Sequence, residues 1–477
     1  MSTLSTKAKI QNLINNANAT TGNSDTTLTP AVNALIEGYG VGSDPILQET
    51  TITENGTYTP GNEIDGFSQV VVNVQPTLQE KTITENGEVT PDDGYDGLSK
   101  VTVNVESSGG GDSDQLLADM IGRTATEISN NSVTKIGNLA FYKWYSGLTS
   151  VNFPNCISIG TSAFTECSSL ATISFPKCET INTRAFAYCK NLTSLDFQAC
   201  TSIGASAFYP CNSIVEVNFP NCLYIGDGAF STASKLTTIS FPKCETIGSG
   251  AFYSCSKLTS VDFPQCKNIG SSAFYSMLAL TTISFPKCET IGSSAFYSCT
   301  SLASPINLPL CTSLGYGTFQ RCTYITEAYL PALSNVEQYA FYNCIRLSSI
   351  SFPVCTSIGS YAFGYCSALT SVNFPVCTVI HSIAFGNCIG LSSANFPVCS
   401  SIGLSAFRSC SALMSLTLAS TSVAKLGNAN AFTGTPMSVS TYTGAFGSIY
   451  VPSSLVDSYK VASNWSTYAD RITAIVE

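Results

Sequence analysis

Apolar and polar residues alternate in a fixed order along most of this chain, and the segment that begins at Leu148 is representative. Val151 and Phe153 are separated by one polar residue, which is the spacing of side chains on one face of a β-strand. Pro154 then removes a backbone donor, so we expect the strand to end there. The apolar residues that follow, up to Cys167, are expected to line the returning side of the same structural unit.

The same order of residues recurs from about residue 140 to residue 432. Most steps between equivalent residues are 22 residues, two are 23 and the last is 25. A period of about 20–29 residues with this leucine-rich pattern is typical of leucine-rich-repeat arrays, in which only stacked units can bury their apolar side chains. The sequence therefore predicts a repeat solenoid of about fourteen 22-residue rungs, each with a short strand and a turn or helical return side, preceded by short helices and two small β modules. The phenylalanines of the Ala-Phe position that mark the rungs are Phe141, Phe164, Phe186, Phe208, Phe230, Phe252, Phe274, Phe296, Phe319, Phe341, Phe363, Phe385, Phe407 and Phe432.

The chain before and after the repeats has its own features. Apolar residues at helical spacing predict two short helices near the N-terminus. A β-rich segment near residue 50 is then duplicated with a 31-residue offset, and Asn-Gly pairs at residues 55–56 and 86–87 indicate type I′ hairpins. The end of the chain predicts a strand and one or two short helices. The expected organisation is an N-terminal helical attachment segment at 1–44, two tandem β modules at 45–106, a Gly/Ser linker at 107–113, the solenoid with a cap helix at Gln115–Ile121 within 114–432, and a C-terminal cap at 433–477.

All 21 cysteines lie in the repeats, in two series about 11 residues apart. Where a repeat departs from the pattern, Ala233, Met277 or Leu333 takes the position, each without loss of a partner cysteine. Free cysteine behaves as a small buried hydrophobe, so we interpret both series as core packing. Disulfides within one series stay geometrically feasible, because adjacent rungs lie ~4.8 Å apart. A metal site is disfavoured, since the chain has one histidine and no Cys-x-x-Cys motif, and no cofactor is predicted.

Charge is sparse in this chain, with 11% charged residues and a formal net charge of −10. The few Lys and Arg residues form no basic stripe, which argues against nucleic-acid binding. No run of about 18 apolar residues occurs, so no membrane-spanning helix is predicted. The first residues lack the apolar segment of a secretory signal and the last carry no hydrophobic anchor, so we expect neither ordinary secretion nor wall anchoring.

Candidate catalytic groups are few. His381, the single histidine, takes a position where most repeats have glycine, as do Asn182 and Glu337. We therefore interpret that position as a surface turn without a strict need for a positive φ. Asp196 and Asp262 share a strand position, but three rungs, or ~14 Å, separate them, which exceeds the ~5–9.5 Å of a glycosidase pair. The sequence predicts a non-catalytic protein, with no catalytic and no metal-binding residues.

Two columns of surface positions are the candidate binding surface. The position after the Ala-Phe pair is often tyrosine, whose ring and hydroxyl suit a sugar or a protein partner; the alternative is that each ring packs against its neighbour along the solenoid. The outward strand positions are rich in Ser, Thr, Asn and Asp, which suit hydrogen bonds to glycans; the alternative is that they only keep a stacked sheet soluble. The candidate residues are Tyr209, Tyr253, Tyr275, Tyr297, Tyr342, Thr238, Ser260, Asp262 and Thr282.

The rung pattern LTSVNFPxCxxIGxxAFxxCSx resembles the BspA-like leucine-rich repeat, a bacterial class with this period, over residues 120–432. The tail YVPSSLVDSYKVASNWSTYADRI resembles the segment that often follows such arrays. At the other end, the ENGTYTP…DGFSQVVVNV doublet and the opening KAKIQNLINNANATTG resemble N-terminal modules of tail-associated proteins from phages and prophages of Gram-positive bacteria. These resemblances imply adhesion or receptor binding and no catalysis.

Together the two resemblances predict a phage tail-associated fibre or receptor-binding protein, assembled in the bacterial cytoplasm and located on the virion. Residues 1–106 are expected to bind other virion or tail proteins, and the solenoid to bind a host-surface glycan or protein, with homo-oligomers as an option. Many weak contacts would be summed by many copies. The alternatives are a BspA-like adhesin on the bacterial cell surface and a structural virion spacer or decoration protein without a receptor.

Overall fold

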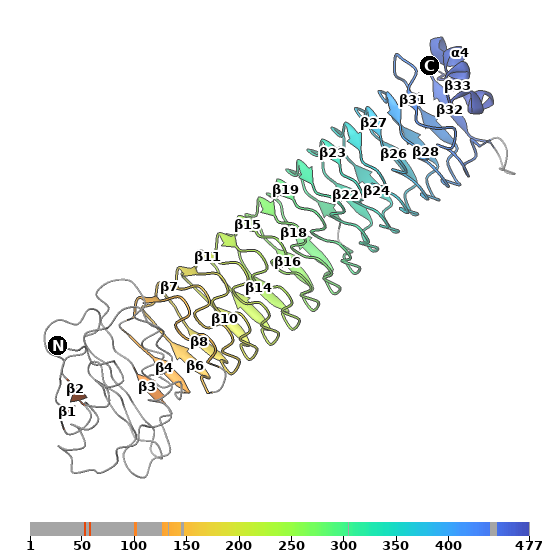
Figure 1. Ribbon diagram of the computed structural model, residues 1–477. Coiled ribbons are helices and arrows are strands. Elements are labelled where there is room, and N and C mark those ends of the chain that lie inside the picture. The colour runs from red at the N-terminus through yellow and green to blue at the C-terminus, as the bar shows by residue number, and fades with distance from the viewer. Residues whose placement is uncertain are drawn as a thin grey trace, which may run out of the picture. The chain divides into compact units, whose positions relative to one another are not determined.

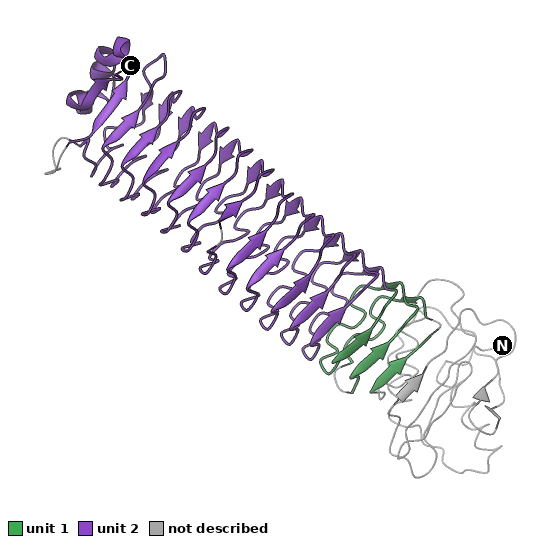
Figure 2. Cartoon of the chain, turned by 180° about the vertical axis from the view of Figure 1, so that it is seen from behind, with its two compact units in different colours: residues 1–177 green, residues 178–477 purple. Residues whose placement is uncertain are grey.

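The computed structural model describes residues 52–53, 57–58, 100–102, 126–131, 133–144, 147–303, 305–438 and 446–476. The chain forms two compact units, Met1–Lys177 and Cys178–Glu477, which Figure 2 colours separately. The helices predicted within residues 1–44 and at Gln115–Ile121 lie outside the described residues.

Unit 1 contains a small antiparallel pair and the first rungs. Its strands are β1 (Ile52–Thr53), β2 (Thr57–Tyr58), β3 (Lys100–Thr102), β4 (Glu127–Ser129), β5 (Lys135–Ile136), β6 (Ser150–Asn152), β7 (Ser158–Ile159) and β8 (Thr172–Ser174). Strands β1 and β2 pair as a hairpin requires, with Thr53 opposite Thr57. This register leaves three residues between the strands, whereas a type I′ turn has two. Strand β3, from the second predicted β module, pairs in parallel with β4.

Each rung of unit 2 has a first strand of two or three residues and a second strand of two, joined by turns (Figure 1). The first strands are β10 (Ser194–Asp196), β12 (Glu216–Asn218), β14 (Thr238–Ser240), β16 (Ser260–Asp262), β18 (Thr282–Ser284), β20 (Ile306–Asn307), β22 (Glu327–Tyr329), β24 (Ser349–Ser351), β26 (Ser371–Asn373), β28 (Ser393–Asn395) and β30 (Ser415–Thr417). The second strands are β9 (Thr180–Ile181), β11 (Ser202–Ile203), β13 (Tyr224–Ile225), β15 (Thr246–Ile247), β17 (Asn268–Ile269), β19 (Thr290–Ile291), β21 (Ser313–Leu314), β23 (Asn335–Val336), β25 (Ser357–Ile358), β27 (Val379–Ile380), β29 (Ser401–Ile402) and β31 (Lys425–Leu426).

Neighbouring rungs pair in parallel and in register. Ser194 of β10 lies opposite Glu216 of β12, and Ser202 of β11 lies opposite Tyr224 of β13. Equivalent residues of successive rungs therefore form columns, as the sequence period predicts, and the repeat-solenoid prediction is confirmed. Between Cys178 and residue 432, the described residues contain no helix, so the return side consists of turns and the second strand. The second strand was not predicted, because two residues of the type Ser-Ile carry too little alternation to be recognised.

The core of unit 2 contains two columns of phenylalanine rings. In the Ala-Phe column, Phe252 stacks on Phe230 and on Phe274 at centroid distances of 5.3 and 5.5 Å. In the Phe-Pro column, Phe263 stacks on Phe285 at 5.6 Å, and it also meets Phe252 at a tilt of 58°. All of these side chains are buried, so the stacking of rungs buries apolar side chains that a single rung would leave exposed.

Glycine is favoured at the position after the second strand because backbones approach closely there, although Asn182, Glu337 and His381 take this position in three rungs. A Cβ added to Gly270 would lie 2.4 Å from the backbone nitrogen of Ser249 in the preceding rung. Gly270 does not have a positive φ, which agrees with our interpretation of this position. The left-handed residues lie elsewhere in the turn, two residues before and two residues after the phenylalanine, as at Ser272 (φ 55°) and Ser276 (φ 54°).

The C-terminal segment covers the end of unit 2. A strand, β32 (Ser448–Val451), precedes three short helical segments, where the sequence predicted one or two: η1 (Ser453–Leu455), α4 (Val456–Val461) and η2 (Ser466–Arg471). An additional strand, β33 (Ile472–Ala474), follows them and pairs with β32, which itself pairs with β30. Trp465 and Tyr468 from this segment pack against the ring of Phe432, the last phenylalanine of its column.

Candidate binding surface

The turn segment of each rung directs some side chains into the core and others out to solvent. In the rung of Phe252, the Phe252 ring is buried and the Tyr253 ring that follows is 37% exposed. The backbone of this turn is also paired with the next rung, because the N–H groups of Gly250, Phe252 and Ser254 donate to carbonyls one rung further on, for example Ser254 to Tyr275 at 2.8 Å. The outward side chains are therefore attached to a backbone that is hydrogen-bonded from rung to rung, as in a β-sheet.

Three tyrosines of the position after Ala-Phe form a stacked ladder. Tyr275 lies between Tyr253 and Tyr297, with centroid distances of 4.8 Å on both sides and interplanar angles of 8° and 6°. Burial between these rings, followed by the proximity of the Tyr297 and Tyr253 hydroxyls, raises the pKa of Tyr275. Each ring thus packs against its neighbour along the solenoid, and the ladder presents ring edges and hydroxyls to solvent.

A second tyrosine group begins in the next rung, with Tyr316, and continues through the following two rungs. Tyr339 stacks on Tyr361 at 4.9 Å, with Tyr316 tilted against it at 5.3 Å. Tyr342 meets Tyr339 and Tyr365 edge to face, at 5.2 and 5.4 Å. A Cβ at Gly364 would lie 3.0 Å from the Tyr342 ring, so a larger residue there would require this ring to shift.

Arg321 lies between the two tyrosine groups. Its guanidinium carbon is 5.9 Å from the centroid of the Tyr297 ring, and its backbone N–H donates to the carbonyl of Tyr342. The positive charge of Arg321 counteracts the rise that burial causes in the pKa of both Tyr275 and Tyr342. We call the resulting set the tyrosine surface; it consists of Tyr253, Tyr275, Tyr297, Tyr316, Tyr339, Tyr342, Tyr361, Tyr365 and Arg321.

The structure groups four of the five candidate tyrosines and separates the fifth. Tyr253, Tyr275, Tyr297 and Tyr342 belong to the tyrosine surface, whereas Tyr209 meets Tyr188 edge to face at 6.0 Å, and the next rung has serine at the equivalent position. Four members of the surface were not predicted, because they occupy other turn positions, which vary in residue type from rung to rung. A signal was present in the 22-residue spacing of two of them; the four are Tyr316, Tyr339, Tyr361 and Tyr365.

The four candidate strand residues lie on the first strands and are exposed. Ser260 and Asp262 are on β16, and Thr282 on β18 lies opposite Ser260. Thr238 is on β14, which pairs with β12 and belongs to a different sheet. These residues share no turn segment with the tyrosine surface, so the two candidate columns are distinct surfaces.

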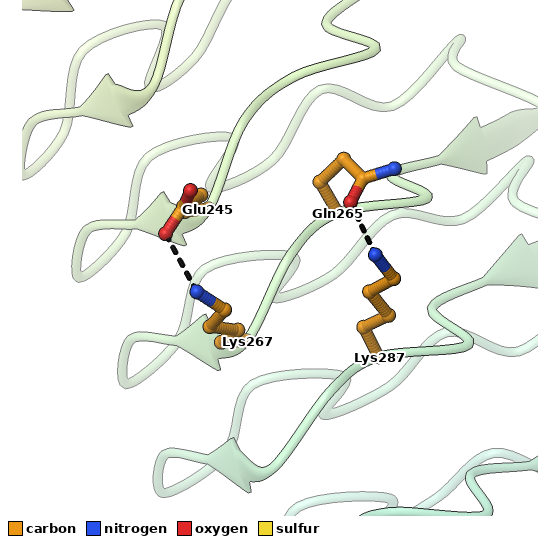
Figure 3. Close-up of polar contacts among 4 residues, drawn as sticks. All are labelled: Glu245, Gln265, Lys267 and Lys287. Atoms are coloured by element: carbon orange, nitrogen blue, oxygen red, sulfur yellow. Dashed lines mark hydrogen bonds and ion pairs between the residues drawn. The ribbon is translucent and has the colours of Figure 1, made fainter.

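Lysine side chains also bind polar side chains of the preceding rung, as Figure 3 shows. Lys267 donates to Glu245 at 2.9 Å, and Lys287 donates to Gln265 at 2.6 Å. The hydrogen bond and charge of Lys267 lower the pKa of Glu245, and the same contact raises the pKa of Lys267. Both partners are about half exposed, so this pair is a solvated surface contact.

All 21 cysteines are buried free thiols, and each series has its own backbone acceptor. In the first series the thiol donates within its own rung, as Cys200 does to the carbonyl of Ser202. In the second it donates to the preceding rung, as Cys255 does to the carbonyl of Phe230 at 3.3 Å. Burial raises the pKa of Cys200 and Cys255 to about 12, which keeps the nucleophilic thiolate form scarce. The thiols therefore pack the core and also satisfy buried carbonyls.

Groups suited to other chemistry are sparse in the described part of the chain. His381 is exposed in its turn, and its backbone N–H donates to the carbonyl of Ile358. Among the described residues, no three His, Cys, Asp or Glu side chains lie close enough together to hold a metal ion. None of the helices in the described ranges is both long and apolar enough to span a membrane.

Comparison with known proteins agrees with this architecture. A leucine-rich repeat protein of Bacteroides ovatus is similar over 87% of this chain and 99% of its own, with 23% identity and a TM-score of 0.57. A leucine rich cell surface protein of Faecalibacterium prausnitzii covers 77% of this chain and 92% of its own length, with 22% identity and a TM-score of 0.32. None of the curated proteins compared with the chain matches it.

The family comparison is more specific than these structural likenesses. The pattern described as the BspA type leucine rich repeat region matches residues 124–237, 223–346 and 334–451, which together span more than half of the sequence. Those ranges contain the columns of phenylalanine and cysteine and the tyrosine surface. The chain therefore belongs to the BspA-type leucine-rich repeat family.

Proposed function

We propose that this chain is a non-catalytic binding protein that attaches to a macromolecule on a cell surface through its solenoid, in the manner of a BspA-like adhesin. One observation carries the proposal: aromatic side chains gather on one face of unit 2 outside its buried core, and Tyr253, Tyr316 and Tyr365 are each more than one-third exposed. An exposed group of this kind, rimmed by polar residues, is typical of a binding surface. The family to which the chain belongs supports the same function.

Binding of the purified full-length chain to intact cells tests this proposal. Labelled protein would be titrated against a panel of bacterial and epithelial cells, with heat-unfolded chain as the control for non-specific adsorption. Saturable binding to at least one cell type is the expected result. Equal adsorption of native and unfolded chain to every cell type would contradict the proposal.

A phage tail-associated fibre or receptor-binding protein is the second candidate, favoured by the sequence resemblance of residues 1–106 to tail-associated modules. In that case the first 106 residues attach the chain to other tail proteins and the solenoid recognises the host. Immunogold electron microscopy of phage particles induced from the host distinguishes the two candidates, because label on a tail favours the fibre and label on the cell envelope favours the adhesin. Label on particles without host binding by the purified chain would indicate a structural spacer.

A further inference from the structure

The turn positions around the tyrosine surface have an unusual composition. Six rungs contribute four positions each, two before and two after the buried pair, at residues 249–250, 253–254 and their equivalents up to 364–365. These 24 positions hold eight Tyr, nine Ser, three Gly, two Gln, one Asn and one Arg, and no Asp or Glu. Binding surfaces are often rich in Tyr, Ser, Gly and Asn, with Arg at the centre. Their hydroxyls offer hydrogen bonds, and the rigid tyrosine rings offer contact area at low entropic cost.

The charge of this region differs from that of the whole chain. Residues 248–366 contain five basic residues and four acidic ones, a net charge of +1, against −10 for the full sequence. Arg321 is exposed and forms no ion pair with another described residue. A guanidinium without a carboxylate partner, placed in the middle of a hydroxyl-rich face, is suited to accept an anionic group from a ligand.

The tyrosine rings are held in place before any ligand arrives. Stacking fixes Tyr275 and Tyr339 between neighbouring rings, so little side-chain freedom remains to be lost on binding. Three tyrosines also have positive φ angles of 58–63°, a backbone conformation that bulky residues rarely adopt; they are Tyr339, Tyr361 and Tyr365. Other rungs hold residues as different as Leu139, Thr232 and Ser272 at these positions, so the left-handed conformation does not itself require tyrosine.

The dimensions of the surface favour a linear ligand. Six rungs at ~4.8 Å span about 24 Å, and three neighbouring residues give a width of about 10 Å. The resulting area of about 240 Å² is well below the ~800 Å² that each partner contributes to a stable protein interface. It suits a narrow chain lying along the rungs, whose repeating hydroxyls can bond to repeating tyrosine and serine hydroxyls.

We propose that the tyrosine surface binds a linear polysaccharide that carries carboxylates, with one carboxylate paired to Arg321. Sugar hydroxyls bond to the tyrosine and serine hydroxyls of successive rungs, and the carboxylate accepts two N–H donors from the guanidinium. This inference rests on the proposed binding function and names its ligand class and its site.

Direct titration of the full-length chain with three carboxylated polysaccharides, polygalacturonate, hyaluronate and polysialic acid, tests the inference. Methyl-esterified polygalacturonate is the matched probe without charge. Two variants use residues that other rungs already have at the same positions and at positive φ: Arg321→Ser, as in Ser298, and the double variant Tyr339→Ser with Tyr361→Ser, as in Ser294. Tyr329→Ser is the control, since it removes an exposed tyrosine from β22, where the adjacent rung has Ser351.

We expect at least one of the three polymers to bind, Arg321→Ser to weaken binding about tenfold to a hundredfold, and the double variant to weaken it at least tenfold, with the control unchanged. Equal affinity for the methyl ester, unchanged affinity of Arg321→Ser, or no binding to any of the three polymers would each overturn the inference. So would cell binding that protease treatment of the cells abolishes and the polysaccharides do not compete, since the ligand would then be a protein. If the chain binds cells and the two variants bind them equally well, this inference fails while the proposed function stands.

Discussion

The ring of Tyr468 stands perpendicular to the ring of Phe432, with their centroids 5.1 Å apart and an interplanar angle of 89°. The Tyr468 hydroxyl also donates to the carbonyl of Ala429 and accepts from the backbone N–H of Phe432. The last rung has no further rung to pair with, so an aromatic side chain closes its apolar core and satisfies its backbone groups. A terminal rung of a solenoid needs such a cap.

Replacing Tyr468 with alanine should loosen the last rung without unfolding the rest of unit 2. Loss of the buried ring is expected to cost about 3–5 kcal/mol, and loss of the hydroxyl alone, in Tyr468→Phe, about 1 kcal/mol. Hydrogen exchange measures this locally: amides of β31 should exchange faster in the alanine variant, and those of β15 should not. Exchange that rises equally in β31 and β15 would show that the cap has a global effect instead.

The sequence was sufficient to predict which residues of each rung lie inside. Leu236, Phe241 and Cys244 are all buried, because a 22-residue period with alternating polarity permits only one stacking register. The turn geometry was not predictable to the same degree. Positive φ angles occur at Thr232, Arg321 and Ile383, which are not residues that signal a left-handed turn. Hydrogen bonds from one rung to the next impose that conformation, and one rung's sequence does not contain them.

The tyrosine surface was only partly predictable for the same reason. Tyr253 and Tyr275 share one position, so their column is visible in the sequence. Tyr339 and Tyr342 belong to different positions of one turn. Their ring centroids lie 5.2 Å apart, and the positive φ of Tyr339 turns the backbone so that the two rings meet. The paired turn conformation places neighbouring columns side by side, and the residue type in one column gives no sign of the column that lies next to it.

Phe263 tests how much the phenylalanine column depends on ring stacking. Leucine already takes the equivalent position at Leu308 and Leu330, so Phe263→Leu should cost less than about 1.5 kcal/mol. Phe263→Ala leaves a cavity beside Phe285 and Phe252 and should cost about 3–5 kcal/mol. Calorimetry measures the melting temperatures of the two variants. Equal falls in melting temperature would show that the shape and stacking of the Phe263 ring matter more than the side-chain volume.

The buried thiols make the fold sensitive to alkaline pH. Burial raises the pKa of Cys211 and Cys255 from 9.0 to about 12, so the folded state keeps them protonated while the unfolded state ionises them. Their contribution to stability is complete below pH 9 and is lost as the pH rises towards 12. At pH 10 each such thiol should lower the free energy of unfolding by roughly 1 kcal/mol, and several together approach the ~5–15 kcal/mol of a typical domain.

Melting temperatures between pH 7 and pH 10.5 measure this effect, and we expect a steep fall above pH 9. The variant Cys255→Ala, which copies Ala233 of the preceding rung, should show a slightly smaller fall than the parent chain. A melting temperature that stays constant from pH 7 to pH 10.5 would contradict the raised pKa values.

The ion pair between Glu245 and Lys267 should contribute little to stability. Both side chains are about half exposed, and solvent screens such contacts. Lys267→Thr, which copies Thr312 in another rung, is therefore expected to leave the melting temperature unchanged. A fall in the melting temperature that high salt also produces in the parent chain would show that the pair is stronger than its exposure implies.

Gly270 and Gly250 illustrate two different constraints on the turn: close approach of neighbouring backbones at Gly270 and a left-handed conformation at Gly250. A Cβ at Gly270 would lie 2.4 Å from the backbone nitrogen of Ser249, so Gly270→Ala must push two rungs apart and should cost about 1–3 kcal/mol. Gly250 has a φ of 59°, but a Cβ there would meet nothing closer than 3.8 Å, and Ser294 takes the equivalent position at φ 55°. Gly250→Ser should therefore cost less than about 1 kcal/mol.

Melting temperatures of the two variants decide between the constraints, with hydrogen exchange of β15 and β17 as the local measurement. Faster exchange in Gly270→Ala alone would show that close approach of neighbouring backbones limits the residue that follows the second strand. If Gly250→Ser is the more damaging change, the left-handed conformation and not the spacing of rungs is the dominant constraint on the turn.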